Sequence, residues 1–231
     1  MYFFLYIGLS LIIIYIGSLI SYILGNFINN DINKSHHLNS VSIIIAVKNG
    51  EQSLPNILYD LNHQDYNGES EYIIVDDQST DNTAEIIKNY SQKNKKIIYV
   101  SSKEGNIKLS FKKRALDAGI RKSKYDILIF TDVDCRLKKE WVKSMASCFY
   151  NQVDYVIGVS EISKPLNIIS RFQKIDLLMM MTAGMAKCNL ESPIASTGQN
   201  QAYKKYLYYE NEGFLKINNS IQGDDSLFMH L

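Results

Sequence analysis

The sequence has almost no excess of charge of either sign, with 25 basic and 24 acidic residues among 231 and a formal net charge of +1. A protein that binds nucleic acid through its phosphates needs a basic surface. The charge balance therefore gives no support to a nucleic-acid partner. The length suits one medium-sized domain with an appendage.

Cysteine is scarce, and the three cysteines, Cys135, Cys148 and Cys188, have no C-x-x-C spacing. Their odd number and their spacing predict neither a disulfide framework nor a zinc site. We expect reduced thiols in a domain that faces the cytosol. The four histidines are not spaced as metal ligands, and the chain lacks a G-x-G-x-x-G or P-loop lysine motif. Dinucleotide and triphosphate chemistry are therefore unsupported.

Charged residues are absent from Met1–Ile28, a stretch dominated by Leu, Ile, Tyr, Phe and Gly. As a helix it is long enough to cross a bilayer, for which about 20 apolar residues suffice. A secretory signal peptide would need a basic start, a shorter apolar core and a small-residue cleavage site. None of these is evident, so we predict a retained transmembrane helix. Aromatic residues near its ends suit the two membrane interfaces, namely Tyr2, Phe3, Phe4, Tyr22 and Phe27.

The residues after this helix suggest an orientation. Lys34 follows the apolar stretch and nothing basic precedes it, which places the remainder of the chain in the cytosol. The polar composition of residues 29–40 predicts a linker, and residues 41–231 form the expected catalytic domain.

Apolar runs and helical patterns alternate from residue 41 onward. Strands are predicted at 41–47, 72–75, 96–100 and 127–130, and helices at 51–63, 82–90 and 110–121. Asn82 and Glu85 predict a capping box for the second helix. A helix over 138–150 and a strand over 155–159 follow. This alternation predicts a mostly parallel sheet with helices on both faces, and such sheets bind ligands beyond the carboxyl ends of their strands.

Polar residues stand at three of these strand ends: Lys48-Asn49, Asp76-Asp77, and the pair Asp132 and Asp134. We expect them to gather at one edge of the sheet. An extended backbone would send the side chains of Asp132 and Asp134 to the same side. Two carboxylates suit Mg²⁺ or Mn²⁺ and, through the metal, a diphosphate. The alternative is a solvated turn with two acids.

Four blocks together resemble the family 2 glycosyltransferases, which have the Rossmann-like GT-A fold. They are Val-Ser-Ile-Ile-Ile-Ala-Val-Lys-Asn from Val41, Ile-Val-Asp-Asp-Gln-Ser-Thr-Asp-Asn-Thr from Ile74, Thr-Asp-Val-Asp-Cys from Thr131, and Gly-Gln-Asn-Gln-Ala-Tyr from Gly198 with a later Gly-Asp-Asp. The resemblance implies metal-dependent, inverting transfer of a sugar from a nucleotide sugar, which we expect to be a UDP-sugar. The acceptor would be a hydroxyl of a lipid or saccharide, in polysaccharide or glycolipid synthesis at the membrane.

On the donor side, the resemblance assigns nucleotide-sugar binding to Val47, Asn49, Asp77, Lys112 and Asp132, and the metal to Asp134. In this family pattern Asp77 accepts from the base, Asp132 lies toward the ribose, and Lys112 lies near the diphosphate. Alternatives remain for two of them. Asp77 could support the start of the following helix, and Lys113 or Arg114 could take the place of Lys112.

On the acceptor side, the resemblance makes Asp225 the general base and Asp224 its acidic neighbour. Asp is also a preferred helix N-cap, and that role for Asp225 is compatible with catalysis. Asn200, with Gln201, would contact sugar hydroxyls, and a structural hydrogen-bonding role is the alternative.

Two further stretches raise questions of organisation. Ile168–Met181 has the pattern of an amphipathic helix, for which we expect core packing, with a lipid-contacting face as the alternative. The chain ends at Leu231, whereas membrane-bound members of the family continue into a Gln-x-x-Arg-Trp-like segment. We therefore expect a C-terminally incomplete domain with an incomplete acceptor side.

Two other functions remain as alternatives. Phe-Thr-Asp-Val-Asp-Cys-Arg also resembles the nucleophile motif of haloacid-dehalogenase-like phosphohydrolases, although Arg136 departs from that motif and Asp76-Asp77 would have no role. The second alternative is an inactive, truncated nucleotide-binding module that serves as a membrane scaffold.

Overall fold

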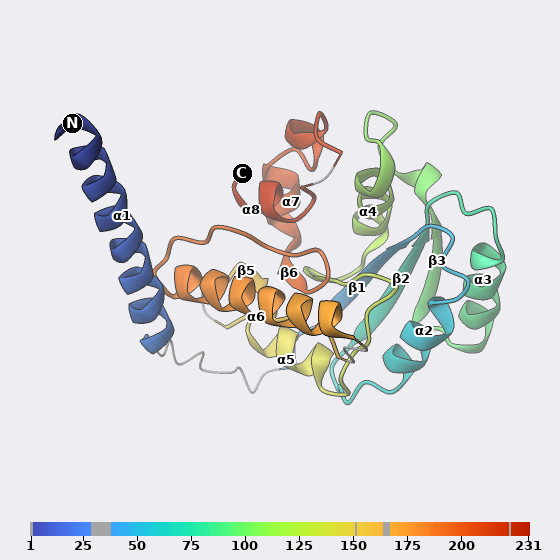
Figure 1. The fold of residues 1–231 in the computed structure, drawn as a ribbon. Coiled ribbons are helices and arrows are strands. Elements are labelled where there is room, and N and C mark those ends of the chain that lie inside the picture. Colours follow the sequence, from blue (N-terminus) through green and yellow to red (C-terminus); the bar gives the residue numbers. More distant parts are fainter. Residues whose placement is uncertain (1, 29–37, 151, 164–166, 222) are drawn as a thin grey trace. The chain divides into compact units, whose positions relative to one another are not determined.

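The computed structural model describes residues 2–28, 38–150, 152–163, 167–221 and 223–231 (Figure 1). The chain forms two compact units. One combines Met1–Ile32 with Val159–Ala195, and the other combines Asn33–Gly158 with Ser196–Leu231. The segment 159–195 thus interrupts the domain expected over 41–231. Most of the linker predicted at 29–40 lies outside the described residues.

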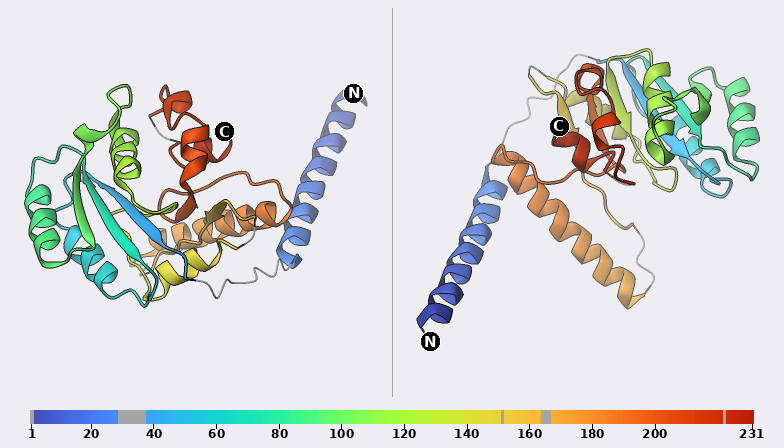
Figure 2. Two further views of the ribbon diagram at one scale, coloured as in Figure 1. Left: turned by 180° about the vertical axis from the view of Figure 1, so that it is seen from behind. Right: turned by 90° about the horizontal axis from the view of Figure 1, so that it is seen from above.

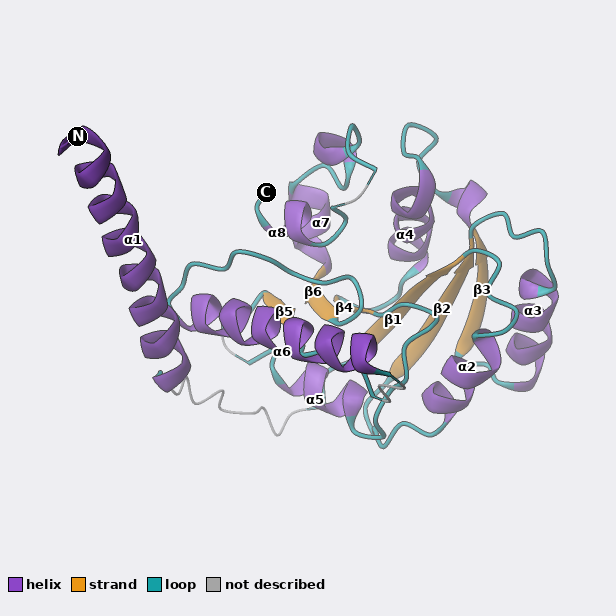
Figure 3. Ribbon diagram, in the orientation of Figure 1, coloured by secondary structure: helices purple, strands orange, loops and turns teal. Residues whose placement is uncertain are grey.

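A six-stranded sheet forms the centre of the second unit, in the order β3-β2-β1-β4-β6-β5 (Figure 3). The first four strands in sequence run parallel, whereas β6 is antiparallel to both β4 and β5. The predicted mostly parallel sheet is confirmed. The strands are β1 (Val41–Val47), β2 (Ser70–Asp76), β3 (Ile97–Ser101), β4 (Ile127–Phe130), β5 (Tyr155–Ile157) and β6 (Gln201–Lys204).

Helices cover both faces of this sheet, as predicted (Figure 2). Because side chains alternate along a strand, Ile43 and Ile45 of β1 belong to one hydrophobic core and Ile44 to the other. The first core includes side chains of α2 (Leu54–Asn62), α3 (Thr83–Lys93) and α5 (Trp141–Ser147). The second includes side chains of α4 (Phe111–Lys122), α7 (Lys205–Glu210) and α8 (Ser226–Met229). Short 3₁₀ helices, η1 (Ser102–Glu104) and η2 (Leu215–Ile217), complete the unit.

The capping box predicted for α3 is wrong. Asn82 is the N-cap residue but makes no side-chain cap bond. Its amide nitrogen instead donates to Oε1 of Glu51, at 3.0 Å, and its backbone N–H donates to Oε2 of the same carboxylate, at 3.2 Å. Asn82 therefore bonds to Glu51, in the loop after β1, and not to Glu85 within its own helix. The local sequence pattern could not indicate this distant partner.

The first unit consists mainly of α1 (Tyr2–Phe27) and α6 (Ile168–Asn189). Among the described residues, α1 is the one helix long and apolar enough to cross a membrane. The two helices contact each other at Gly25 and Ala186, where any side chain on Gly25 would overlap the Ala186 backbone. Asn189 Nδ2 donates to the carbonyls of Gly25 and Ile28, at 3.0 and 3.3 Å.

The predictions for α6 were wrong in two respects. The helix has 22 residues and continues to Asn189 rather than ending at Met181. Core packing is also wrong, because Ala186 is the one buried residue of this helix and its large apolar side chains are exposed. A segment with many apolar residues packs in a core only where the topology supplies a facing surface, and sequence periodicity carries no information on that.

Candidate active site

The candidate site lies at the edge of the sheet where β1, β2 and β4 end. Val47 pairs with Asp76 and Ile44 pairs with Phe130, so the loops that follow these parallel strands emerge together. Because β6 is antiparallel, its first residue, Gln201, pairs with Phe130. The segment that precedes β6 therefore lies at the same edge. The prediction that the polar strand ends gather at one edge is confirmed.

Lys112 connects two of the predicted acids. Its Nζ lies 2.8 Å from Oδ1 of Asp132 and 3.5 Å from Oδ2 of Asp224. Burial alone lowers the pKa of Lys112, but the neighbouring charges of Asp224 and Asp132 outweigh it and hold that pKa above its ordinary value. The side chain therefore remains cationic at neutral pH.

The neighbouring basic residues have other partners. Lys113 is 1% exposed, and its Nζ donates to the carbonyls of Ile217, at 2.8 Å, and of Ser220. Burial lowers the pKa of Lys113. Arg114 donates to the Lys103 carbonyl at 3.3 Å. Of the three consecutive basic residues, Lys112 is thus the one that pairs with Asp132 and Asp224, and its place near a diphosphate stays a prediction.

Gly198 lies beside Lys112 and the two acids that precede α8. A Cβ added there would lie 3.2 Å from Lys112 Nζ, 3.6 Å from Asp224 Oδ2 and 3.8 Å from Asp225 Oδ2. The Gly198 N–H donates to Asp225 Oδ2 at 3.1 Å. The structure therefore brings Lys112, Asp224 and Asp225 together around one residue, with Asp132 joined through Lys112.

Asp225 is the N-cap of α8, the role that the sequence offered as a compatible alternative, and its Oδ1 accepts from the Ser226 N–H at 2.6 Å. A carboxylate has about four lone-pair sites, so these two bonds leave room for a further donor. Asp224 is 8% exposed, and its Oδ2 has no hydrogen bond within the described residues. Its contact with Lys112, at 3.5 Å, is an ion pair beyond good hydrogen-bonding distance. The ion pair offsets part of the cost of burying this oxygen, and a donor from a ligand would supply the hydrogen bond that it lacks.

The two acids after β4 do not lie on a strand. β4 ends at Phe130, and the Cys135 N–H donates to the Asp132 carbonyl at 3.2 Å, closing a turn. The expectation that strand alternation directs both acids to one side was therefore wrong, because the extended backbone stops before them. Asp132 pairs with Lys112, whereas Asp134 is exposed.

Asp134 fits a metal that is shared with a ligand. Within the described ranges its carboxylate has no hydrogen bond or ion pair, and no group of three His, Cys, Asp or Glu side chains is placed to hold a metal. Mg²⁺ is commonly held by one or two carboxylates together with substrate phosphates. A single unpaired carboxylate suits that arrangement and does not suit a cage made by the protein alone.

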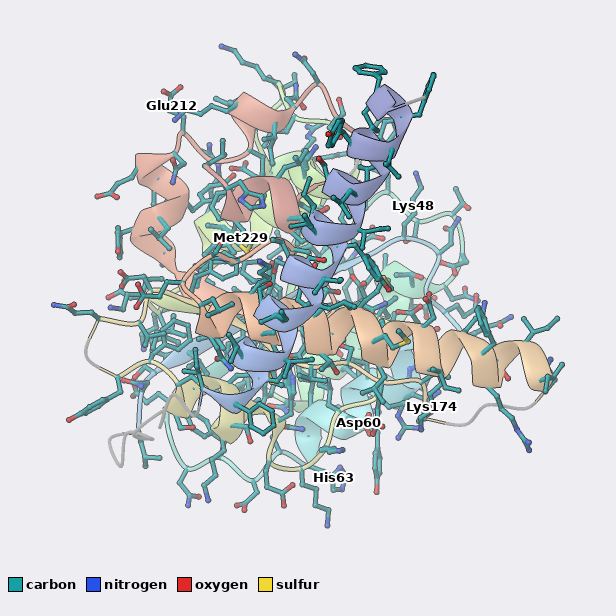
Figure 4. The ribbon with its side chains drawn as sticks, turned by 60° about the vertical axis from the view of Figure 1, so that its left-hand side comes forward. Lys48, Asp60, His63, Lys174, Glu212 and Met229 are labelled. Atoms are coloured by element: carbon teal, nitrogen blue, oxygen red, sulfur yellow. The ribbon has the colours of Figure 1, made fainter. Side chains whose placement is uncertain are left out.

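Hydrogen bonds join the loop after β1 to the loop after β2. Lys48, which Figure 4 labels, lies in the first of these loops. Asn49 Oδ1 accepts from the Thr80 N–H at 2.8 Å, and the Asn49 N–H donates to Ser79 Oγ at 2.9 Å. Asn49 and Gln78 have φ values of +51° and +55°, a strained region for residues other than glycine that is enriched at functional sites. The carboxamide oxygen of Asn49 thus holds the loops together, and its contact with a nucleotide sugar stays a prediction.

Two other predicted donor residues lie beside these loops. Val47 is 1% exposed, and its carbonyl accepts from the Asp77 N–H at 2.7 Å. The side chain of Val47 therefore packs in the core. The carboxylate of Asp77 is half-buried and has no hydrogen bond or ion pair to any residue that the structure describes. It is available to a ligand.

The contacts of Asn200 and Gln201 support their structural alternative. The Trp141 indole N–H donates to Asn200 Oδ1 at 3.0 Å. Gln201 is 1% exposed, and its Oε1 accepts from the Tyr155 hydroxyl at 2.6 Å and from Ser196 Oγ at 2.9 Å. Burial raises the pKa of the Tyr155 phenol, which stays a donor. A direct contact of Asn200 with an acceptor stays a prediction.

Two features of the site were missed by the sequence reasoning. Asp60, on α2 (Figure 4), accepts from Arg136 Nε and from its terminal nitrogen at 2.7 and 2.8 Å, and from the Leu137 N–H at 2.9 Å. This ion pair fixes the chain that follows Asp134. Phe111, directly before Lys112, is 62% exposed and has a φ of +53°. Neither feature has a local sequence signal, because the partners of Asp60 are distant in sequence and Phe is not a residue that indicates positive φ.

The comparisons with known proteins identify a family. A family model described as Glycosyl transferase family 2 matches residues 42–209. Over 101 residues the chain is 37% identical to a 4,4'-diaponeurosporenoate glycosyltransferase of Staphylococcus haemolyticus, and over 107 residues it is 32% identical to the poly(ribitol-phosphate) beta-N-acetylglucosaminyltransferase TarS of Staphylococcus aureus. These matches cover 44% and 46% of this chain but 26% and 18% of the relatives, so the chain corresponds to only part of their length.

A solved structure extends the comparison to the fold. The mannosyltransferase PcManGT of Pyrobaculum calidifontis, in complex with GDP-Man and Mn²⁺, matches with a TM-score of 0.71 at 19% identity. The match covers 96% of this chain and 61% of that one. At this identity the likeness shows the fold alone, and the fold is that of the GT-A glycosyltransferases.

Proposed function

This chain belongs to glycosyl transferase family 2, and we propose that it transfers a sugar from a nucleotide-sugar donor to a hydroxyl group of an acceptor. The haloacid-dehalogenase-like alternative is wrong, because the family match contains the Asp132 and Asp134 motif within residues 42–209. The inactive scaffold remains as an outcome of the test below.

The donor is a UDP-sugar in this proposal. Asp77 and Asp134 are available carboxylates at one edge of the sheet, one suited to accept from a nucleotide base and the other to ligate Mg²⁺ or Mn²⁺. Such a metal, when bound, neutralises charge that develops on the departing diphosphate, an effect worth several kcal/mol. Lys112 adds a positive charge beside Asp132. In the same proposal Asp132 contacts the ribose, and Val47 and Asn49 also contact the nucleotide sugar.

On the acceptor side, Asp225 is the base that removes the proton from the acceptor hydroxyl. The reacting carbon has oxocarbenium character in such transfers, and a base opposite the leaving group gives inversion. The bonds of Asp225 to Gly198 and Ser226 hold its carboxylate in place. The acceptor is a lipid or saccharide, and Asp224 and Asn200 lie on its side of the site.

The reaction takes place at a membrane in this proposal. Within Phe3–Phe27, an 18-residue window has a mean hydropathy of 2.4 and no buried residue. This supports a transmembrane anchor, with the catalytic unit in the cytosol. A membrane-bound enzyme suits polysaccharide or glycolipid synthesis at the cell envelope.

The observation that carries the proposal is the convergence of Lys112, Asp224 and Asp225 around Gly198, with Asp132 joined to them through Lys112. The test is a titration of the purified chain with UDP, GDP and a simple phosphomonoester, with and without Mn²⁺. We expect metal-dependent binding of UDP that is lost in Asp134→Ala. The matched control is Glu140→Ala, an exposed acid in the same segment, which should bind as the wild type does.

Other outcomes separate the alternatives. Tighter binding of GDP than of UDP would support the transferase function and indicate a GDP-sugar donor in place of a UDP-sugar. Metal-dependent UDP binding without transfer to any membrane extract would favour the inactive module. If UDP and GDP both fail to bind in the presence of Mn²⁺, the proposed function is overturned.

A further inference from the structure

Exposed apolar side chains cover much of α6, and four of them form a stripe along one face. Ile168, Phe172, Ile175 and Met179 have 79%, 71%, 58% and 67% of their surface exposed. Their spacing of four, three and four residues places them on one side of a helix. Large contiguous apolar patches are rare on soluble monomers and mark interaction sites.

The stripe leads to the contact with α1. Ala186 follows Ile168 by 18 residues, which is five full turns at 3.6 residues per turn, so it lies on the same face. Ala186 is buried against Gly25 of α1. Figure 2 shows the C-terminal ends of α1 and α6 meeting. The exposed face of α6 is therefore continuous with the surface that contacts the proposed transmembrane helix.

The charges of α6 favour an anionic surface. The helix carries Arg171, Lys174 and Lys187 against one acid, Asp176. Lys174 (Figure 4) pairs with Glu161 at a distance of 3.8 Å, and the Lys187 ammonium lies over the Tyr22 ring of α1, 5.4 Å from its centre. Helices with an apolar face and basic flanks lie in the headgroup region of anionic bilayers.

We propose that α6 lies in the surface of an anionic bilayer, with the stripe from Ile168 to Met179 inserted among the acyl chains beside the end of α1. The inference rests on the membrane anchor of the proposed function. Because α6 lies between β5 and β6 in sequence, this contact ties the catalytic chain to the membrane at a second place.

The experiment measures the depth of two matched positions. Ile175 and Leu177 are two residues apart, which places them about 200° apart around the helix, and Leu177 is half-buried. Full-length Ile175→Trp and Leu177→Trp are reconstituted in phosphatidylethanolamine–phosphatidylglycerol vesicles with or without brominated acyl chains. We expect bromine to quench the added Ile175→Trp emission at least twofold more than that of Leu177→Trp. The wild type supplies the background of Trp141, the one native tryptophan.

Controls separate this inference from the others. Ile13→Trp reports on α1, so quenching there without quenching at Ile175→Trp would leave the anchor intact and overturn the inference. Equal quenching at Ile175→Trp and Leu177→Trp would also overturn it. So would Ile175→Trp emission typical of an apolar environment that bromine does not quench, because this result would indicate a protein partner. Replacing phosphatidylglycerol by phosphatidylcholine should weaken the quenching, and an unchanged signal would reject the anionic preference. Sugar transfer is not measured, so loss of the proposed activity would be a separate result.

Discussion

The acidic residues on the two sides of the candidate site differ in their bonding partners. On the donor side, within the part of the chain that the structure describes, the carboxylates of Asp77 and Asp134 have no hydrogen bond or ion pair. On the acceptor side, Asp225 bonds to Gly198 and Ser226, and Asp224 pairs with Lys112. The donor side thus offers two open carboxylates beside Asp132, which is paired with Lys112, whereas the acids of the acceptor side also hold the fold together.

The difference follows from how each side is built. The donor loops leave parallel strands whose backbone bonds already fix them. The acceptor side joins the loop before β6 to the start of α8, two segments without a shared strand. Side chains must link them, and Ser226 does so by accepting from the Ser196 N–H at 3.0 Å and donating to its carbonyl at 2.8 Å.

The largest effect is expected at Asp225. Asp225→Asn should lower sugar transfer by about 10²- to 10⁴-fold, the range of a general base, with UDP binding unchanged. Asn keeps one acceptor oxygen for Gly198 or Ser226, so the fold should survive with a loss of about 1 kcal/mol. Transfer rate, UDP affinity and thermal unfolding are measured together. Asp126→Asn, an exposed acid, is the control. Equal loss of binding and transfer would mean that Asp225 is only structural and would erase the contrast between the two sides.

Lys112 joins the two sides, and its removal should affect both. Lys112→Met is expected to lower transfer by about tenfold to a hundredfold, since a hydrogen bond to a charged group is worth roughly 1.5–3 kcal/mol. Because the pKa of Lys112 is raised in the folded protein, its stabilising contribution is complete at neutral pH and is lost as pH rises through that folded pKa. The free energy of unfolding, measured from pH 7 upward, should show this loss in the wild type and not in Lys112→Met. Lys108→Met, at an exposed lysine, should match the wild type in both measurements.

Asp60 gives the reference for a purely structural acid. Asp60→Asn removes the ion pair with Arg136 and should cost about 1–3 kcal/mol of unfolding free energy, with little change in UDP affinity per folded molecule. Burial raises the pKa of Asp60, but Arg136 and the Leu137 N–H outweigh it and lower that pKa below the ordinary value of 3.8. The stabilisation is therefore present above about pH 4 and lost as pH falls through the folded pKa. Denaturation at pH 7 and pH 3 tests this, with exposed Asp65→Asn as control. A variant as stable as the wild type at pH 7 would contradict it.

The smallest effect is expected at Gly198. A Cβ there would press on the end of the flexible Lys112 side chain at 3.2 Å, so Lys112 can shift by a few tenths of an ångström. Gly198→Ala should lower transfer by less than about tenfold, because small misplacements of a positioning group reduce rates. Gly184→Ala, where an added Cβ meets nothing within 4 Å, should leave transfer unchanged. A loss at Gly198→Ala as large as at Asp225→Asn would mean that the acceptor side tolerates no displacement at all.

The strands and the sheet edge could be predicted because the relevant signals are local. β1 and β4 begin and end where the apolar runs do, since a strand buried on both faces must be apolar throughout. The predicted helix boundaries were less accurate. The helix predicted over 51–63 is α2 over Leu54–Asn62, and the helix predicted over 138–150 is α5 over Trp141–Ser147. The first and last turns of a helix depend on caps that tertiary partners supply.

The sequence alone determined the apolar N-terminal helix, the parallel strands and the placement of acids after them, because hydrophobic periodicity and strand direction are properties of short segments. Only the tertiary structure decided that Lys112 rather than Lys113 faces Asp132, that Asp132 and Asp134 lie in a turn and not on a strand, and that Asp225 holds Gly198. Each of these depends on a partner distant along the chain, and α6 exposes its apolar face for the same reason: burial is settled by what packs against a segment and not by its own residues.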